Sequence, residues 1–230
     1  MTKQLFWIIL YGWALTYHGL LWVHIYHEGS RTSLAIVTMA LGLLVIWGVL
    51  LGLVQKKFMQ SRSLVVVSSP RFVIYMMLLM TGLACMAEVV SVTMTNTAYL
   101  WSLSPYEAYI TASPNYIEVV TRHSVIVFLP QFLAITLLHH RYQYKGFAWF
   151  VMYGLIGYVN EWLAFGEAAS WVSIPFWMII YGWIVYLPTH WLRPDKARIK
   201  VRIYHYGAAL FVPLAFSIPW ALFLVAWLHS

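Results

Sequence analysis

The stretch LAIVTMALGLLVIWGVLLGLV, residues 34–54, contains 21 residues without a single charge and with one hydroxyl group, that of Thr38. A helix of about 20 apolar residues is long enough to cross the hydrocarbon core of a bilayer. Lys56 and Lys57 follow this stretch directly, and basic residues next to a span are typical of its cytoplasmic end. The stretch therefore predicts a transmembrane helix, and the rest of the chain repeats its pattern.

Six further runs have a similar length and apolarity. Their length favours helices over the shorter, alternating strands of a membrane β-barrel. The fourth run is the least regular, because Arg122 and His123 lie at its start and Pro130 interrupts it. The sequence predicts an all-α, polytopic membrane protein with a single domain over residues 1–230 and seven transmembrane helices, at 5–26, 34–54, 72–93, 120–138, 147–165, 168–191 and 206–228.

The composition points to the same class of protein. Of the 230 residues, 62% are hydrophobic and 9% are charged, whereas about 25% of the residues of a soluble domain are charged. This excludes a soluble enzyme, a nucleic-acid binder and a disordered chain. The partners expected are membrane lipids and a lipid or isoprenoid substrate, with no nucleic acid. The one cysteine, Cys85, has no partner for an intrachain disulfide.

The distribution of charge predicts an orientation. Twelve of the fourteen basic residues fall at the N-terminus or in alternate connections, and only Arg31 and Arg122 fall on the other side. By the positive-inside rule, the N-terminus is cytoplasmic and, with seven spans, the C-terminus is external. Four of the seven acidic residues lie on the external side: Glu28, Glu107, Glu118 and Glu167.

Two acidic residues, Glu88 and Glu161, lie inside predicted spans. A carboxylate at the centre of a span costs about 2.5–3.5 kcal/mol on insertion scales, and such residues mark function by default. They lie 16 and 14 positions after the starts of the spans at 72–93 and 147–165, which places both in the outer half of the membrane. The alternative interpretation is a pair of protonated carboxyls that only hold helices together.

Both glutamates have polar or small neighbours at helical spacing. Gly154, Gly157 and Tyr158 share a face with Glu161, and Asn160 is adjacent to it. Small residues on such a face allow another helix to approach closely. Around Glu88 the stripe consists of Thr81, Cys85, Ser91 and Thr95.

Aromatic residues gather at the predicted depth of the two glutamates. Aromatic faces stabilise cations, and a carboxyl removed from water stays protonated and acts as an acid. This combination suits carbocation chemistry. We therefore predict Glu88 and Glu161 as catalytic residues and five residues as substrate-binding: Asn160, Tyr158, Trp162, Trp171 and His18. Three further aromatic residues lie at this depth: Tyr153, Trp177 and Trp101.

Histidines near each end of the spans raise the question of a metal or haem. The chain contains neither an HExxH motif nor repeated HxxxH boxes, so no metal site is predicted. Haem ligands lie deeper in a span than the inner histidines do, so no cofactor is predicted. The outer group is His18, His24, His27 and His123, and the inner group is His139, His140, His190 and His205.

Two short blocks resemble the small integral-membrane terpene cyclases of meroterpenoid pathways. The first is Gly12-Trp13, Tyr17, Gly19 and His27-Glu28, and the second is Trp162, Glu167-Ala168, Trp171 and Pro175. The resemblance implies a seven-helix enzyme in which acidic residues protonate an epoxide or an alkene. It assigns no catalytic residue here, because the span at 34–54, where the family has an acid, contains neither Asp nor Glu.

Three functions follow as hypotheses. The leading one is an enzyme, related to terpene or isoprenoid cyclases, that cyclises, isomerises or hydrates an isoprenoid or lipid in the outer half of the bilayer. The second is a proton- or cation-coupled transporter that uses the same glutamates. The third is a non-catalytic subunit of a larger membrane complex.

Overall fold

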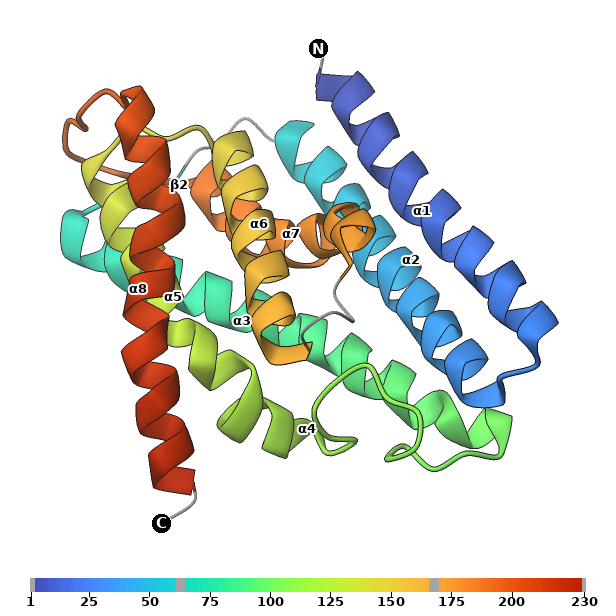
Figure 1. Ribbon diagram of the computed structural model, residues 1–230. Helices are drawn as coiled ribbons and strands as arrows, with labels where there is room; N and C mark the ends of the chain where they lie inside the picture. Colours follow the sequence, from blue (N-terminus) through green and yellow to red (C-terminus); the bar gives the residue numbers. More distant parts are fainter. Residues whose placement is uncertain (1–2, 61–64, 166–169, 229–230) are drawn as a thin grey trace.

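The computed structural model describes residues 3–60, 65–165 and 170–228, and the fold is almost entirely helical (Figure 1). The long helices are α1 (Lys3–Glu28), α2 (Arg31–Gln60), α3 (Ser69–Asn96), α5 (Val125–Arg141), α6 (Gly146–Phe165), α7 (Ile174–Trp191) and α8 (Ile203–Leu228). The short helices are η1 (Thr97–Trp101), α4 (Tyr116–Glu118), η2 (Val119–His123) and η4 (Trp171–Ser173), and the two strands are β1 (Val65–Val67) and β2 (Leu192–Pro194).

Within the described residues, five helices are long and apolar enough to cross a membrane, and the pair formed by the α4–η2 segment and α5 makes a sixth if it is one bent span. This is the architecture of a multi-pass membrane protein. The remaining long helix, α6, is not among these candidates, and it carries the polar pair Asn160 and Glu161 near its C-terminal end.

Helix α7 lies at the centre of the bundle. It is buried without interruption from Met178 to Thr189 and packs against α1, α2, α3 and α6. A helix that is apolar on every face needs neighbours on every side. Indole and phenol groups complete its surroundings: Trp183 Nε1 donates to Tyr11 Oη, Tyr11 Oη donates to the Gly48 carbonyl, and Trp47 Nε1 donates to the Ile180 carbonyl.

The connections predicted to be cytoplasmic meet at one end of the bundle. Strand β1 pairs in parallel with β2, with Val66 opposite Arg193, and a single bridge joins Tyr142 to Ile199. The N-terminus lies at the same end as β2, and the C-terminus lies at the opposite end (Figure 1). The all-α fold class is confirmed, and the two three-residue strands add to it without a signal in the sequence, because segments this short carry no periodic pattern.

Buried polar contacts hold this end together. Burial raises the pKa of Tyr144 to about 12, so its hydroxyl stays protonated and donates to the His205 carbonyl at 2.6 Å. Trp149 Nε1 donates to His139 Nδ1 at 2.9 Å, and Arg198 contacts the same ring and the His139 carbonyl, both at 3.3 Å. His139 and His205 are therefore structural here, each engaged by neighbouring protein groups.

The irregular fourth run is a broken helix. The axis of α5 is bent by 50° from that of the α4–η2 segment, with the break at Ser124. Inside α5, Pro130 has no N–H to donate to the Ile126 carbonyl four residues before it. Trp220 of α8 supplies the missing donor, because its Nε1 donates to that carbonyl at 2.9 Å. The carbonyl that Pro130 leaves without a backbone partner in α5 is thus the contact point for Trp220 of α8.

Removing this donor tests the pairing. Trp220→Phe is expected to lower the free energy of unfolding by about 1 kcal/mol, because the half-buried Ile126 carbonyl loses its hydrogen-bond partner. In a Pro130→Ala background, the backbone of the new alanine supplies the missing N–H, so the same substitution is expected to cost less. Unfolding of all four proteins in mixed micelles measures the difference. An equal cost in both backgrounds would show that Trp220 acts through packing alone.

Candidate functional site

The site is built around a hydrogen bond between Tyr181 of α7 and Glu161 of α6. Tyr181 Oη donates to Glu161 Oε1. Tyr181 is buried, and its phenol also interacts electrostatically with Glu88 and Tyr153. Glu161 is thus a carboxyl held by a phenol between two helices.

Three glycines make this contact possible. A Cβ atom on Gly157 would lie 2.3 Å from Cγ and Cδ2 of Tyr181, so the phenol ring lies directly on the backbone of α6. A Cβ on Gly154 would meet Met178 Cα at 2.7 Å, and one on Gly182 would meet the Phe150 carbonyl at 2.8 Å. The close helix approach predicted from the glycines of α6 is confirmed.

Glu88 of α3 is half-buried and belongs to the same site. Its Oε2 accepts a hydrogen bond from Thr111 Oγ1 at 3.4 Å, and Ser124 is a second side-chain partner of the same carboxyl. Glu88 and Glu161 lie close enough to interact electrostatically. No described lysine, arginine or histidine forms an ion pair with either carboxyl. The two acids therefore share one environment without a basic neighbour to neutralise them.

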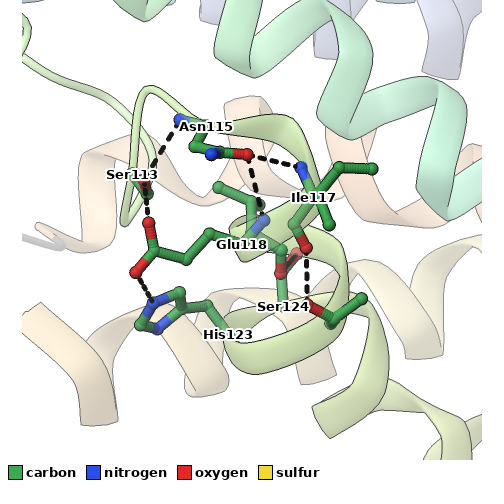
Figure 2. A network of polar contacts seen from close by, with 8 residues as sticks. Ser113, Asn115, Ile117, Glu118, His123 and Ser124 are labelled. Atoms are coloured by element: carbon green, nitrogen blue, oxygen red, sulfur yellow. Dashed lines mark hydrogen bonds and ion pairs between the residues drawn. The ribbon is translucent and has the colours of Figure 1, made fainter.

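Both partners of Glu88, Thr111 and Ser124, belong to the segment between α3 and α5. A network of polar contacts within this segment holds it in shape (Figure 2). Asn115 caps α4, since its Oδ1 accepts from the backbone N–H groups of Ile117 and Glu118. Glu118 in turn accepts from Ser113 Oγ at 2.7 Å, and its other oxygen lies 3.9 Å from Nε2 of His123. The two residues that contact Glu88 flank this network along the chain, so the network limits how far they move.

A second anchor of the same segment comes from α3 itself. The backbone N–H of Ile110 donates to Thr95 Oγ1 at 3.2 Å, and Thr95 is completely buried. Thr95 is one of the stripe of polar residues on the face of Glu88. Through Thr95, the helix that carries Glu88 thus anchors the long connection that follows it.

Asn160 faces a different helix from Glu161. Its side chain exchanges two hydrogen bonds with Gln131 of α5, at 3.2 and 3.3 Å, and Gln131 is almost completely buried. The amide pair joins α5 to α6 one residue before the glutamate. Asn160 therefore positions the helix that carries Glu161.

The other predicted substrate-binding residues are dispersed. Trp162 and Trp171 are 52% and 68% exposed, so their side chains point away from the interior, and the structure does not bring them to the glutamates. His18 is buried on α1, where Nδ1 lies 2.9 Å from the Ala14 carbonyl and the ring packs on Phe176. Tyr158 is half-buried on α6, one turn before Trp162.

Two buried donors beside Tyr181 have no hydrogen-bond partner among the described residues. They are the hydroxyl of Tyr153 on α6 and Nε1 of Trp177 on α7. Both rings pack on Tyr181, with ring centroids 6.2 and 6.0 Å away. Phe128 and Phe132 complete the aromatic surroundings, the first against Tyr181 and the second against Tyr153.

Tyr181, Gln131 and Thr111 are site residues that the sequence did not reveal. Tyr181 lies in a run that is apolar on every face and shows no polar stripe. Gln131 follows Pro130, and that position signalled a broken helix rather than a polar partner. Thr111 lies in a long connection with no periodicity. Only the spacing of Gly154 and Gly157 pointed toward the neighbouring helix, without naming the residue that fills the space.

A groove elsewhere on the protein is not lined by any of the predicted site residues. It has a volume of about 450 Å³. It lies between α2 and the α3–η1 region and is lined by Thr38, Gly42, Ile46, Met94, Thr97, Leu100 and Trp101.

The described residues contain no group of three or more His, Cys, Asp or Glu side chains placed to hold a metal ion. His24 pairs with Glu28 at the exposed end of α1, at 3.0 Å, rather than joining the histidines at that end. The polar groups that the described residues bring together at the site are the two carboxyls, the phenols of Tyr153 and Tyr181, and the indole of Trp177.

Comparison of the chain with protein-family models, with curated proteins and with solved structures finds no match. Residues 166–169, which include Glu167 and Ala168 of the second cyclase-like block, lie outside the described part of the chain.

Proposed function

We propose that the protein is an integral-membrane enzyme that acts on an isoprenoid or other lipid by acid–base chemistry, with Glu88 and Glu161 as its acid and base. One observation carries the proposal: the two carboxyls lie close enough to interact beside the aromatic ring of Tyr181, and no described Lys, Arg or His forms an ion pair with either. Groups of this kind are expensive in a membrane and mark function by default. The cyclase-like blocks at Gly12-Trp13 and Trp162 support the same class of reaction.

The two carboxyls divide the roles between them. Two nearby carboxyls in a dry site do not both ionise, so one keeps its proton. Glu161 accepts a hydrogen bond from the phenol of Tyr181, whereas Glu88 accepts one from the aliphatic hydroxyl of Thr111, which is the weaker donor. We assign Glu88 as the acid and Glu161 as the base.

The reaction then balances without a cofactor. Glu88 transfers its proton to one carbon of a substrate alkene, and the neighbouring carbon becomes a cation. The faces of Tyr153, Tyr181 and Trp177 stabilise that charge. Glu161 removes a proton from an adjacent carbon, and the electrons of that C–H bond form the new double bond. The product is a double-bond isomer of the substrate. Where a second alkene of the substrate attacks the cation first, its π electrons form the ring bond, a new cation arises, and Glu161 removes the proton next to that cation to give a cyclic isomer.

A deuterium experiment tests this function. Membranes containing the protein are incubated in D₂O buffer with a lipid extract of the expressing cells and with a set of linear polyprenyl compounds. An isomeric product carrying one deuterium per turnover is expected, since the acid exchanges with solvent. The Glu88→Gln/Glu161→Gln protein, inserted at the same level, is expected to form none. Equal product from both proteins would refute the assignment.

The finer topology is part of the proposal. All seven long helices, with α4–η2–α5 as one bent span, cross the bilayer with the N-terminus cytoplasmic. The contacts among the connections support this arrangement, because β1, β2, Tyr142 and Ile199 meet at one end. Most of the basic residues lie in or next to these connections.

Cysteine labelling measures the orientation. In a Cys85→Ala background, a membrane-impermeant thiol reagent is expected to label Tyr106→Cys in intact cells. It is expected to label Ala197→Cys only after the cells are permeabilised. Both positions are exposed. The reverse pattern would overturn the N-in orientation, and labelling of both in intact cells would overturn the span count.

A second candidate function, proton- or cation-coupled transport, is favoured by one feature of α5. Gln131, Thr136 and His139 are buried along the inner part of this helix, so polar side chains continue from the glutamates toward the basic end. Proteoliposomes with an internal pH dye discriminate. A proton flux that Glu161→Gln abolishes, without product formation in the deuterium experiment, would favour transport over catalysis.

A further inference from the structure

The unpartnered donors beside Tyr181 indicate what the site receives. Tyr153 is completely buried, and its hydroxyl has no hydrogen-bond partner among the described residues. Trp177 is half-buried, but its Nε1 is buried and likewise has no hydrogen-bond partner among the described residues. A buried donor without an acceptor costs free energy comparable to a lost hydrogen bond, so such groups are rare in a folded protein. The rings that carry these two unpaired donors both pack on Tyr181, so we look for one explanation that accounts for both.

Water is a poor explanation for both. A buried water molecule needs two to four polar partners, and the rings around these donors are those of Phe132, Phe176 and Tyr181. The phenol of Tyr181 is already engaged with Glu161. A ligand that brings its own acceptor atom satisfies the donors without further protein groups.

The charges of the surrounding helices restrict the ligand further. Residues 146–189, which include all of α6 and nearly all of α7, contain no Lys, Arg or His, and neither do residues 72–96 of α3. Glu161 is hydrogen-bonded to Tyr181, on which both donor rings pack, and its carboxyl repels an anion. The basic side chain on this side of the bundle is His18 of α1, which packs on Phe176, with its Nδ1 2.9 Å from the Ala14 carbonyl. A phosphate or carboxylate therefore has no partner here, and a pure hydrocarbon leaves both donors unpaired.

Building on the proposed function, we propose that Tyr153 Oη and Trp177 Nε1 form a neutral donor subsite that binds the uncharged, oxygen-bearing end of the ligand. An indole N–H only donates, and a buried phenol with no acceptor donates as well. The subsite thus selects ketone, ether or ester oxygens. It places that end of the ligand one aromatic ring away from the Glu161–Tyr181 pair.

Binding without turnover tests the subsite by itself. The Glu88→Gln/Glu161→Gln protein is mixed with farnesylacetone that carries ¹³C at its carbonyl, and the ¹³C=O stretch is recorded by infrared difference spectroscopy. The bound ketone is expected to absorb at lower frequency than in lipid, because its oxygen accepts hydrogen bonds. Tyr153→Phe and Trp177→Phe are each expected to reverse part of this shift and to weaken binding about threefold to tenfold.

Matched ligands and a matched variant serve as controls. β-Farnesene, which has no oxygen, is expected to bind the Tyr153→Phe/Trp177→Phe protein at least as tightly as the parent, since no donor is left unpaired. Farnesyl phosphate is expected not to compete with the ketone. Tyr99→Phe removes an exposed hydroxyl from η1 and is expected to change neither the stretch nor the affinity.

Different experimental results refute the donor subsite and the proposed enzymatic function. Bound ketone with an unshifted carbonyl, or a shift that survives in the double Phe variant, would overturn the subsite even if the glutamates prove essential for turnover. A shift that depends on Tyr153 and Trp177 would uphold the subsite even if the deuterium experiment shows no product. Tighter binding of farnesyl phosphate than of the ketone would also overturn it.

Discussion

Replacing Glu161 with glutamine is expected to lower the rate of deuterium transfer from solvent to product by about 10²–10⁴-fold, the usual contribution of a positioned acid or base. Glutamine keeps the shape of the side chain and still accepts the hydrogen bond of Tyr181. It cannot remove a proton from the cationic intermediate. The loss is therefore expected in the rate of turnover, with little change in ligand affinity.

Variants around Glu161 separate catalysis from positioning. Glu88→Gln removes the acid and is expected to cause a loss of the same order. Tyr181→Phe leaves both carboxyls but releases Glu161, so a smaller loss is expected. Glu28→Gln alters an exposed glutamate that pairs with His24 at the surface and is expected to change nothing. Full activity of Glu161→Gln, in a protein that inserts and folds normally, would remove Glu161 from the mechanism.

The largest effect on stability is expected for Gly157→Ala. The new methyl group would lie 2.3 Å from two ring atoms of Tyr181 and 2.6 Å from its Cβ, so α6 and α7 must move apart or the phenol must leave Glu161. Overpacking of this kind costs about 1–3 kcal/mol, and here the upper end is expected because the ring is enclosed. Turnover is expected to fall as well, since the Glu161–Tyr181 contact depends on the same approach.

Gly82→Ala is the matched control. Gly82 also lies within a long helix, α3, but an added Cβ meets no atom within 4 Å. The substitution is expected to be neutral or to stabilise by up to about 1 kcal/mol through the unfolded state. Thermal unfolding in detergent, together with the deuterium rate, measures both variants. Equal stability of Gly157→Ala and Gly82→Ala would contradict the close packing of Tyr181 on α6.

The residues around Glu161 show why only part of the site was predictable. Successive residues on a helix are separated by about 100°, so neighbours in sequence face different surroundings. Glu161 faces Tyr181 of α7, Asn160 faces Gln131 of α5, and Trp162 is mostly exposed. The three residues are consecutive in the sequence, and the free-energy cost of placing a carboxyl in the membrane distinguished the glutamate from the other two. The sequence offered no means of telling which helix each one faces.

The aromatic residues illustrate the same limit. Trp162, Trp171, Trp177 and Tyr153 share a predicted depth, which follows from counting along the helices. Trp177 and Tyr153 are in the interior beside Tyr181, whereas Trp162 and Trp171 point outward. The depth of a residue in the membrane follows from its position along the helix axis. The direction in which its side chain points depends on how the helix is rotated about that axis, and this rotation is set by packing against the other helices.

What the sequence determined by itself is the class of protein and the two unusual charges within it. Long apolar runs have no stable alternative to membrane helices, and a carboxyl in such a run stands out without any knowledge of its neighbours. What only the tertiary structure decided is the partnership of those carboxyls: Tyr181 on Glu161, Thr111 on Glu88, and the two glutamates within reach of each other. These contacts join residues 20 or more positions apart, on separate helices or a connection. They depend on small side chains, Gly157 above all, whose effect appears only where two helices touch.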